Sequence, residues 1–199
     1  MLKLKLSNTS LECGTDEAGR GCLAGPVTAA AVLLPDDFSH PWLTDSKQLS
    51  EAKRLALREV IEKEAISVAF CHVMMDEIDQ INILNASITA MHRSIGKLSP
   101  QPGFIAVDGN RFKPFLKIPH ETVVKGDGKY LHIAAASIIA KTERDAFMKR
   151  IHEEYPMYQW HKNKGYPTAD HREALVEFGP SPYHRKSFKL LPEQLRLDL

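Results

Sequence analysis

The expected architecture starts from residues 11–34, which read LECGTDEAGRGCLAGPVTAAAVLL. Residues 11–16 and 27–34 are short apolar runs bounded by turn-forming residues, a pattern that predicts two β-strands. The glycine-rich segment 19–25 connects them and follows directly after two adjacent acids, Asp16 and Glu17. We therefore expect a pair of strands that carries carboxylates where the chain turns.

Helices and strands alternate after this pair. Ser50 is a good N-cap for a helix over residues 51–65, in which apolar residues recur every fourth position. Residues 66–73 predict a third strand. Asp76 opens a long helix with one apolar stripe that ends before Pro100.

The second half of the chain continues the alternation. Residues 104–108 form a buried strand that ends in Asp108, and residues 122–124 predict a further short strand. Residues 130–152 predict a helix whose small-residue start allows close approach to a neighbouring element. Thr168 caps a last helix that stops at Gly179. The sequence predicts an α/β fold with a mixed central sheet, flanking helices and a mostly helical C-terminal third.

Composition describes a folding globular chain, with 43% hydrophobic and 26% charged residues among 199. We expect one domain over residues 1–199, with residues from about 155 to 199 as a helical extension. The net charge is only +1, but residues 111–164 hold eleven Lys and Arg against six Asp and Glu. This excess indicates either a modest basic surface or a solvated helix face.

The chain shows no signal for secretion or for a membrane. Residues 1–10 lack the apolar core of a signal peptide, and no segment approaches the roughly 20 apolar residues of a membrane span. The three cysteines form no CxxC pair, which argues against a zinc site and a disulfide framework. We expect a cytoplasmic protein with no membrane association.

Four carboxylates stand beside glycines at predicted turns. Asp16 and Glu17 would point to opposite faces of a regular strand, so one site needs the strand to end or bulge there. Asp108 is a turn residue or, at the tip of a buried strand, a ligand in the position where α/β sheets bind ligands. Asp127 reads equally as a turn residue. Together these acids can gather around divalent metal ions.

Six motifs in order resemble the bacterial ribonuclease HII family, the type 2 ribonucleases H. They are Asp16-Glu17-Ala18-Gly19-Arg20-Gly21, Asp45-Ser46-Lys47, Asp108-Gly109-Asn110, Lys125-Gly126-Asp127, Ala135-Ala136-Ser137-Ile138-Ile139-Ala140-Lys141 and Lys164-Gly165-Tyr166-Pro167-Thr168. The resemblance covers about residue 11 to the stretch 184–188. It implies a ribonuclease H-like fold and endonucleolytic cleavage of RNA in RNA/DNA hybrids. It also implies cutting 5′ of single ribonucleotides in duplex DNA, with a role in replication and repair.

The resemblance also implies roles for individual residues. Asp16, Glu17, Asp108 and Asp127 would bind two Mg²⁺ or Mn²⁺ ions, which activate water and leave a 5′-phosphate and a 3′-hydroxyl. The contacts that it implies for the substrate are Gly19, Arg20, Gly21, Lys47, Ser137, Lys141 and Tyr166. In this family the Gly-Arg-Gly segment reads the 2′-hydroxyl and the tyrosine packs on the neighbouring deoxyribose. No obligate protein partner is implied, and we expect a monomer.

Several alternatives stay open. The spacing of Ser137, Lys141 and Arg144 places them on one helix face, which could contact phosphates. Lys141 could instead pair with Asp145 one turn later. At the level of function, the chain could be another ribonuclease H-like nuclease, such as a ribonuclease HIII, or a noncatalytic module that binds hybrids.

Overall fold

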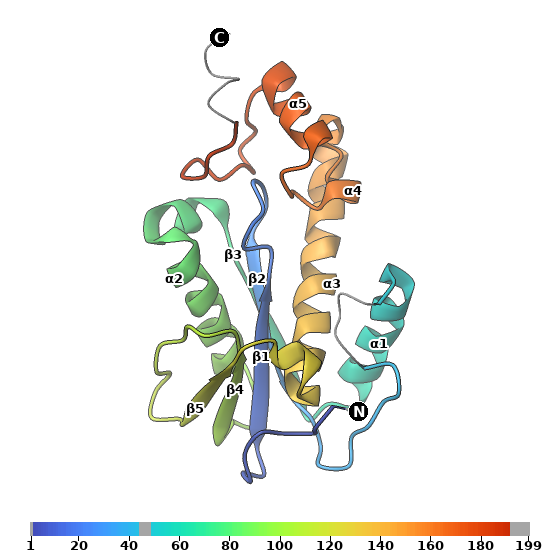
Figure 1. Cartoon of the computed structure of the whole chain (residues 1–199), viewed down its shortest axis with the longest axis vertical. Helices are drawn as coiled ribbons and strands as arrows, with labels where there is room; N and C mark the ends of the chain where they lie inside the picture. Colours follow the sequence, from blue (N-terminus) through green and yellow to red (C-terminus); the bar gives the residue numbers. More distant parts are fainter. Residues whose placement is uncertain (1, 44–48, 192–199) are drawn as a thin grey trace.

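The structure, a computed structural model, describes residues 2–43 and 49–191 and contains a five-stranded sheet. The strand order is β3-β2-β1-β4-β5 (Figure 1). β2 is antiparallel to both β1 and β3, whereas β4 is parallel to β1 and to β5. The strands are β1 (Glu12–Ala18), β2 (Val27–Leu33), β3 (Ser67–Val73), β4 (Phe104–Asp108) and β5 (His120–Val123). The predicted mixed sheet is confirmed.

Helices cover both faces of this sheet. α2 lies on one face, and α1 and α3 lie on the other, while α4 and α5 sit near the far end of α3 (Figure 1). The helices are α1 (Glu51–Glu64), α2 (Met75–Gly96), α3 (Leu131–Glu154), α4 (Trp160–Asn163) and α5 (Ala169–Phe178). Two short 3-10 turns, η2 (Gly126–Gly128) and η3 (Pro156–Tyr158), complete the described elements. The expected helical C-terminal region is present.

Small residues bring α3 against the centre of the sheet, as the sequence predicted. A Cβ on Gly14 of β1 would lie 2.1 Å from the backbone carbon of His132, so only glycine permits this approach. Ala134, Ala135 and Ala136 are fully buried in the same layer. α3 therefore runs close along β1 and carries its polar side chains to the end of that strand.

Two elements differ from expectation. β1 does not end or bulge at the acids, because Asp16 and Glu17 continue in regular register with Ala30 and Ala29 of β2. α2 is interrupted at Asn82, whose φ of 64° is non-helical. With a ψ of 163° this is a strained backbone conformation for a residue other than glycine. The Oδ1 of Asn82 accepts a hydrogen bond from Asn85 N at 3.1 Å, which caps the helix that starts again after it.

A separate hydrophobic cluster joins the C-terminal region to the loop that follows β1. Leu23 and Ala24 of that loop pack with Met148 of α3 and with Trp160 and Leu175 from the C-terminal region. The loop is thus held by elements that lie far away in the sequence. Across residues 2–43 and 49–191, no helix is both long and apolar enough to cross a membrane.

Candidate active site

A cavity of about 490 Å³ opens where β1 passes the end of β4. It is lined by residues from β1 and its following loop, β4, α1, α3 and the segment 162–166. The residues singled out from the sequence that line it are Asp16, Glu17, Gly19, Arg20, Gly21, Asp108, Ser137, Lys141 and Tyr166. Lys47 lies outside the described residues. The structure thus gathers most of the expected site around one cavity.

Asp16 lies on the face of β1 that meets α3, and it is 6% exposed. Its Oδ1 accepts a hydrogen bond from the backbone N–H of Glu17 at 2.6 Å, and Ser137 also hydrogen-bonds to it. Burial, followed by the charges of Glu17 and Asp108, raises the pKa of Asp16 well above its usual range. The protein therefore holds this carboxylate where its charge is costly unless a cation comes close.

Glu17 reaches the same cavity although its position in β1 faces the other side of the sheet. β4 pairs with β1 only as far as Thr15, so Glu17 lies at a free edge. Its Oε1 accepts a hydrogen bond from Arg20 Nη1 at 3.1 Å. Burial raises the pKa of Glu17 even though Arg20 opposes the shift. Glu17 can reach the cavity because β4 does not pair with β1 beside it, and no bulge in β1 is needed.

Asp108 stands at the end of β4 and faces the turn η2. Its Oδ1 accepts hydrogen bonds from Gly126 N at 2.7 Å and from Asp127 N at 3.4 Å. The turn requires close packing, because a Cβ on Gly126 would lie 2.6 Å from Ile133 Cδ1. The backbone of η2 therefore orients the Asp108 carboxylate.

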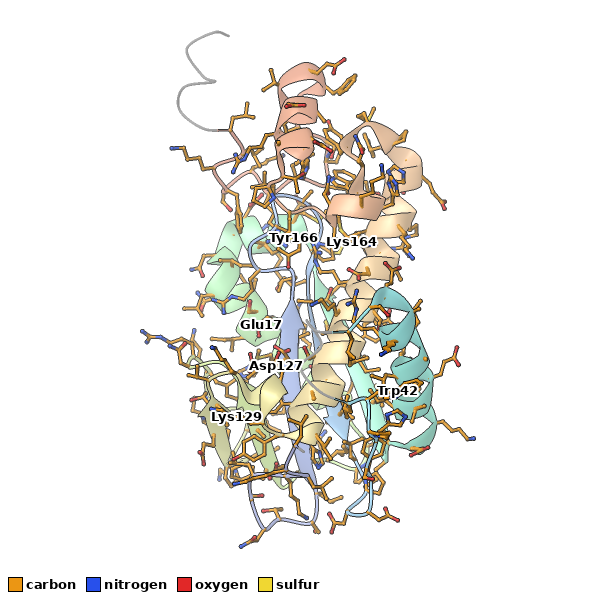
Figure 2. All side chains as sticks on the ribbon, turned by 45° about the vertical axis from the view of Figure 1, so that its right-hand side comes forward. Glu17, Trp42, Asp127, Lys129, Lys164 and Tyr166 are labelled. Carbon is orange, nitrogen blue, oxygen red and sulfur yellow. The ribbon has the colours of Figure 1, made fainter. Side chains whose placement is uncertain are left out.

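Asp127 flanks the cavity without lining it. Asp127 is 3% exposed and lies on η2, and Figure 2 shows it below Glu17, with Tyr166 and Lys164 above both. Among the described residues, no three His, Cys, Asp or Glu side chains are already gathered in a metal-ligating arrangement. The chemistry of the donors nevertheless suits a hard cation, because Asp16, Glu17 and Asp108 offer carboxylate oxygens to one cavity.

Two buried arginines hold the loop that follows β1. Arg185 donates from Nη2 to Gly19 O at 2.7 Å and from Nη1 to Arg20 O at 2.9 Å. It also donates from Nε to Gly25 O at 3.0 Å. Burial, followed by the charge of Arg144, lowers the pKa of Arg185 to about 10, so it stays charged at neutral pH. The sequence analysis gave Arg185 no role, because backbone acceptors leave no side-chain pattern to detect.

Arg144 is the second of these arginines. It is 2% exposed and donates to three backbone carbonyls, those of Pro26, Lys164 and Ala24. These donors join the β1–β2 loop to the segment before Tyr166. Arg144 also lines the cavity, but these three bonds use its guanidinium inside the protein, so its observed role is to hold the loop and the phosphate contact suggested by its spacing stays a prediction.

The rim of the cavity is basic near α1 and α3. Lys141 lines it with Arg54, Lys162 and Lys164, of which the sequence analysis gave no role to Arg54 or Lys162. Asp145, the alternative partner that the spacing offered to Lys141, has its Oδ2 at 3.8 Å from Arg54 Nη2. Three of these basic residues belong to the segment 111–164, in which Lys and Arg outnumber Asp and Glu, so part of the positive charge of that segment faces the cavity.

Tyr166 stands at the opposite end of the site from Asp127. Figure 2 shows Tyr166 and Lys164 beside the loop that follows β1, above Glu17 in that view. The Tyr166 side chain is 47% exposed and lines the cavity. The cavity thus has carboxylates at one end and a partly exposed aromatic ring at the other.

The sequence matches a known protein family over most of its length. The sequence model of the family Ribonuclease HII matches residues 13–191. Ribonuclease HII of Christiangramia forsetii is 61% identical over 196 residues, which cover 98% of this chain and 99% of the relative. Ribonuclease HII of Bacteroides thetaiotaomicron is 60% identical over 199 residues, which cover 100% of both chains.

Solved structures share the fold. A structure of the PCNA:RNase HII complex from Archaeoglobus fulgidus matches with a TM-score of 0.78 and 27% identity, covering 94% of this chain and 97% of that one. Ribonuclease H2 from Pyrococcus horikoshii OT3 has a TM-score of 0.77 at 24% identity, covering 93% and 98%. Bst-RNase HIII in complex with Mn²⁺ has a TM-score of 0.72 at 16% identity, covering 96% and 70%. The last two likenesses show the fold alone.

Proposed function

The chain belongs to the ribonuclease HII family, and from this premise we propose that it cuts duplex DNA on the 5′ side of a single embedded ribonucleotide. As a member of the family it is an endonuclease of the ribonuclease H type that acts on RNA/DNA hybrids. Membership excludes the noncatalytic hybrid-binding module. The proposed finer activity implies a role in removing ribonucleotides during replication and repair.

One observation carries the proposal: the buried Asp16 shares a cavity with the partly buried Glu17 and Asp108, with a glycine-rich loop and with a tyrosine. Burial and mutual repulsion raise the pKa of Asp16 and favour the binding of a cation. We propose that Asp16, Glu17, Asp108 and Asp127 hold two divalent ions, either Mg²⁺ or Mn²⁺. Such ions supply an activated water and neutralise the leaving 3′-oxygen. The products would carry a 5′-phosphate and a 3′-hydroxyl.

The chain's own residues would prepare this chemistry. Asp108 is held by the backbone of η2, so its carboxylate is oriented before substrate arrives. Ser137 hydrogen-bonds to Asp16 and, with Lys141, lines the cavity from α3. We propose that Lys141 and Lys47 contact the phosphate backbone, which would position the strand for attack.

The loop after β1 is suited to reading the 2′-hydroxyl, the group that distinguishes RNA from DNA. Arg185 fixes the carbonyls of Gly19 and Arg20. A Cβ on Gly21 would meet nothing within 4 Å, so open space lies beside this backbone. We propose that a ribose sits there and that Tyr166 packs on the adjacent deoxyribose, which would favour an RNA-to-DNA junction.

A cleavage assay tests the proposal. A duplex with one internal ribonucleotide is incubated with the protein and Mg²⁺, and the cut is mapped to the nucleotide. An all-DNA duplex and Asp16→Asn protein serve as controls. We expect a single cut 5′ to the ribonucleotide by the wild type alone, lost with a chelator and restored by Mg²⁺ or Mn²⁺. Cutting that persists without divalent ions would overturn the proposal. A protein that cuts long RNA/DNA hybrids but not the single-ribonucleotide duplex would also overturn it.

The remaining expectations belong to this proposal as well. We propose that the protein acts as a monomer in the cytoplasm and needs no protein partner for cleavage. Because the cavity and its loop are built within one chain, no second copy is required to complete the site. Activity proportional to protein concentration in dilute assays would support this, since a dissociating oligomer would lose specific activity on dilution.

A further inference from the structure

Two buried histidines form a hydrogen-bonded chain that ends on the backbone of Tyr166. His171 of α5 is 0% exposed and His184 is 1% exposed, and their Nε2 atoms lie 3.1 Å apart. Trp160 Nε1 also lies 3.1 Å from His171 Nε2. On its other side, His171 Nδ1 lies 2.9 Å from the carbonyl oxygen of Tyr166. The chain thus joins the C-terminal region to a residue of the cavity.

The donors and acceptors at its ends determine the position of every proton. The backbone N–H of Ser181 donates to His184 Nδ1 at 2.9 Å, so a neutral His184 carries its proton on Nε2. The indole N–H of Trp160 can only donate, so His171 Nε2 accepts. His171 must then carry its proton on Nδ1 and donate it to the Tyr166 carbonyl. In this orientation the N–H groups of Trp160 and His184 share the one lone pair of His171 Nε2 as a three-centre hydrogen bond.

The surroundings of both rings favour the neutral form. Burial lowers the pKa of His171, and burial followed by the charge of His171 lowers the pKa of His184 to about 4. A proton added to His171 Nε2 would face the N–H groups of Trp160 and His184. The chain is therefore stable only in its neutral form.

We propose that His171 is a positioning residue for substrate discrimination, fixing the backbone of Tyr166 while His184 selects the tautomer of His171. The inference rests on the proposed function, in which Tyr166 contacts the deoxyribose beside a ribonucleotide. His171 touches no substrate. It acts through the Tyr166 carbonyl alone.

The carbonyl is an effective point of control because it belongs to the peptide bond before Pro167. A residue before proline is restricted to extended conformations, so fixing this peptide plane also fixes the direction in which the side chain leaves. The Thr168 N–H donates to the same oxygen at 2.8 Å. Tyr166 is 47% exposed and its side chain hydrogen-bonds to Cys22, so the direction set by the backbone acts together with this one contact to orient the ring in the cavity.

The same C-terminal segment also holds the other half of the proposed reading surface. His184 is followed by Arg185, which donates to the carbonyls of Gly19 and Arg20. Arg185 therefore contacts the loop proposed to read the ribose, and its neighbour His184 contacts Tyr166 through His171. This places the two halves in a fixed relation, as reading an RNA-to-DNA junction requires.

Two substitutions at His171 distinguish the hydrogen bond made by Nδ1 from those made by Nε2. The amide nitrogen of His171→Asn falls near the position of Nδ1 and can still donate to the Tyr166 carbonyl. The longer His171→Gln places its amide near Nε2, where it can meet His184 and Trp160, and leaves the Tyr166 carbonyl without this donor. Both variants lose part of the chain, so both should unfold at lower temperature. A purely structural role would make them equivalent in specificity.

The measurement is the ratio of kcat/KM for a single-ribonucleotide duplex to that for a long RNA/DNA hybrid, which lacks the junction deoxyribose. For His171→Gln we expect this ratio to fall about tenfold, which corresponds to roughly 1.4 kcal/mol. For His171→Asn we expect it to stay within about twofold of wild type. Trp160→Phe removes a donor on the far side of His171 and should also keep the ratio. Equal ratios for the Asn and Gln variants would overturn the inference.

The outcomes separate this inference from the function on which it rests. If the wild-type protein does not cut the single-ribonucleotide duplex, the proposed function fails first. If the wild type cuts it and the two His171 variants discriminate alike, only the positioning role fails. Nitrogen-15 spectra of the histidines give a second readout: the proton of His171 is expected on Nδ1 and that of His184 on Nε2. A proton on His171 Nε2 would overturn the tautomer assignment.

Discussion

The carboxylate end of the cavity and the C-terminal region that supports its other end bury charge in opposite ways. Asp16 and Glu17 are held close to other acids, and the pKa of each is raised. Arg185 of the C-terminal region and Arg144 of α3 are buried, but each donates to three backbone carbonyls. Carboxylates that are held next to other acids can bind a cationic ligand. Arginines whose three guanidinium nitrogens all donate to backbone carbonyls stabilise the fold instead.

The largest expected effect separates catalysis from stability at the carboxylate end. Asp16→Asn should lower cleavage of an RNA/DNA hybrid by roughly 10³-fold, because a proposed metal ligand is lost. It should also raise the free energy of unfolding at pH 7. A folded-state pKa above the unfolded value penalises folding wherever the carboxylate is ionised, and the penalty disappears below the unfolded pKa. Urea unfolding at pH 7 and at pH 4 measures this gain.

The gain from Asp16→Asn should be present at pH 7 and much smaller at pH 4, which is close to the unfolded pKa of an aspartate and below the raised folded-state pKa of Asp16. Ser137→Ala, which removes a partner of Asp16 and adds no charge, is the matched control and should not stabilise the protein. A less stable Asp16→Asn protein would show that Asp16 supports the fold.

The opposite behaviour is expected at Arg185. Arg185→Met should lower the free energy of unfolding by about 3 kcal/mol, because three carbonyls of the loop after β1 lose their donor. Its neighbour Lys186 is exposed, and Lys186→Met should change stability by no more than about 0.5 kcal/mol. Urea unfolding of both variants makes the comparison. Equal small changes would remove the distinction between the two regions.

Alanine substitutions at two glycines of the loop after β1 should have different consequences, one for stability and one for cleavage, and both effects should be smaller than those above. Gly19 has a φ of 90°, and a Cβ there would lie 1.9 Å from Arg144 Nε, so Gly19→Ala should destabilise the fold by about 1–3 kcal/mol. A Cβ on Gly21 meets nothing within 4 Å. Gly21→Ala should therefore keep the thermal unfolding temperature and lower cleavage at a single ribonucleotide by roughly tenfold or more, by crowding the ribose. Unchanged cleavage by Gly21→Ala would exclude this contact.

The same contrast explains what could be predicted from the sequence. The sheet and the long helices follow from local periodicity, and Asp16 and Asp108 are recognisable because each belongs to a short motif of acids and glycine. The course of β1 through Glu17 was not predictable from its own residues, since pairing with Ala29 and Ala30 decides it. How Glu17 reaches the cavity depends on where β4 stops.

The supporting residues were missed for a related reason. Arg185 bonds to carbonyls that lie more than 150 positions away in the sequence, and His171 acts on a carbonyl of Tyr166. A backbone acceptor is the same at every residue, so no side-chain pattern announces such a bond. Arg144 was assigned to phosphates because its helical spacing matches Lys141, and spacing alone does not reveal burial.

The most direct test asks whether reading the ribonucleotide survives the loss of catalysis. Asp108→Asn protein is titrated with a single-ribonucleotide duplex and with an all-DNA duplex, in Mg²⁺ and at fixed salt, and the two Kd values are compared. The account predicts no cleavage and an unchanged preference for the ribonucleotide duplex, because Gly19, Arg20 and Tyr166 are held by the C-terminal region. Loss of that preference together with cleavage would contradict it.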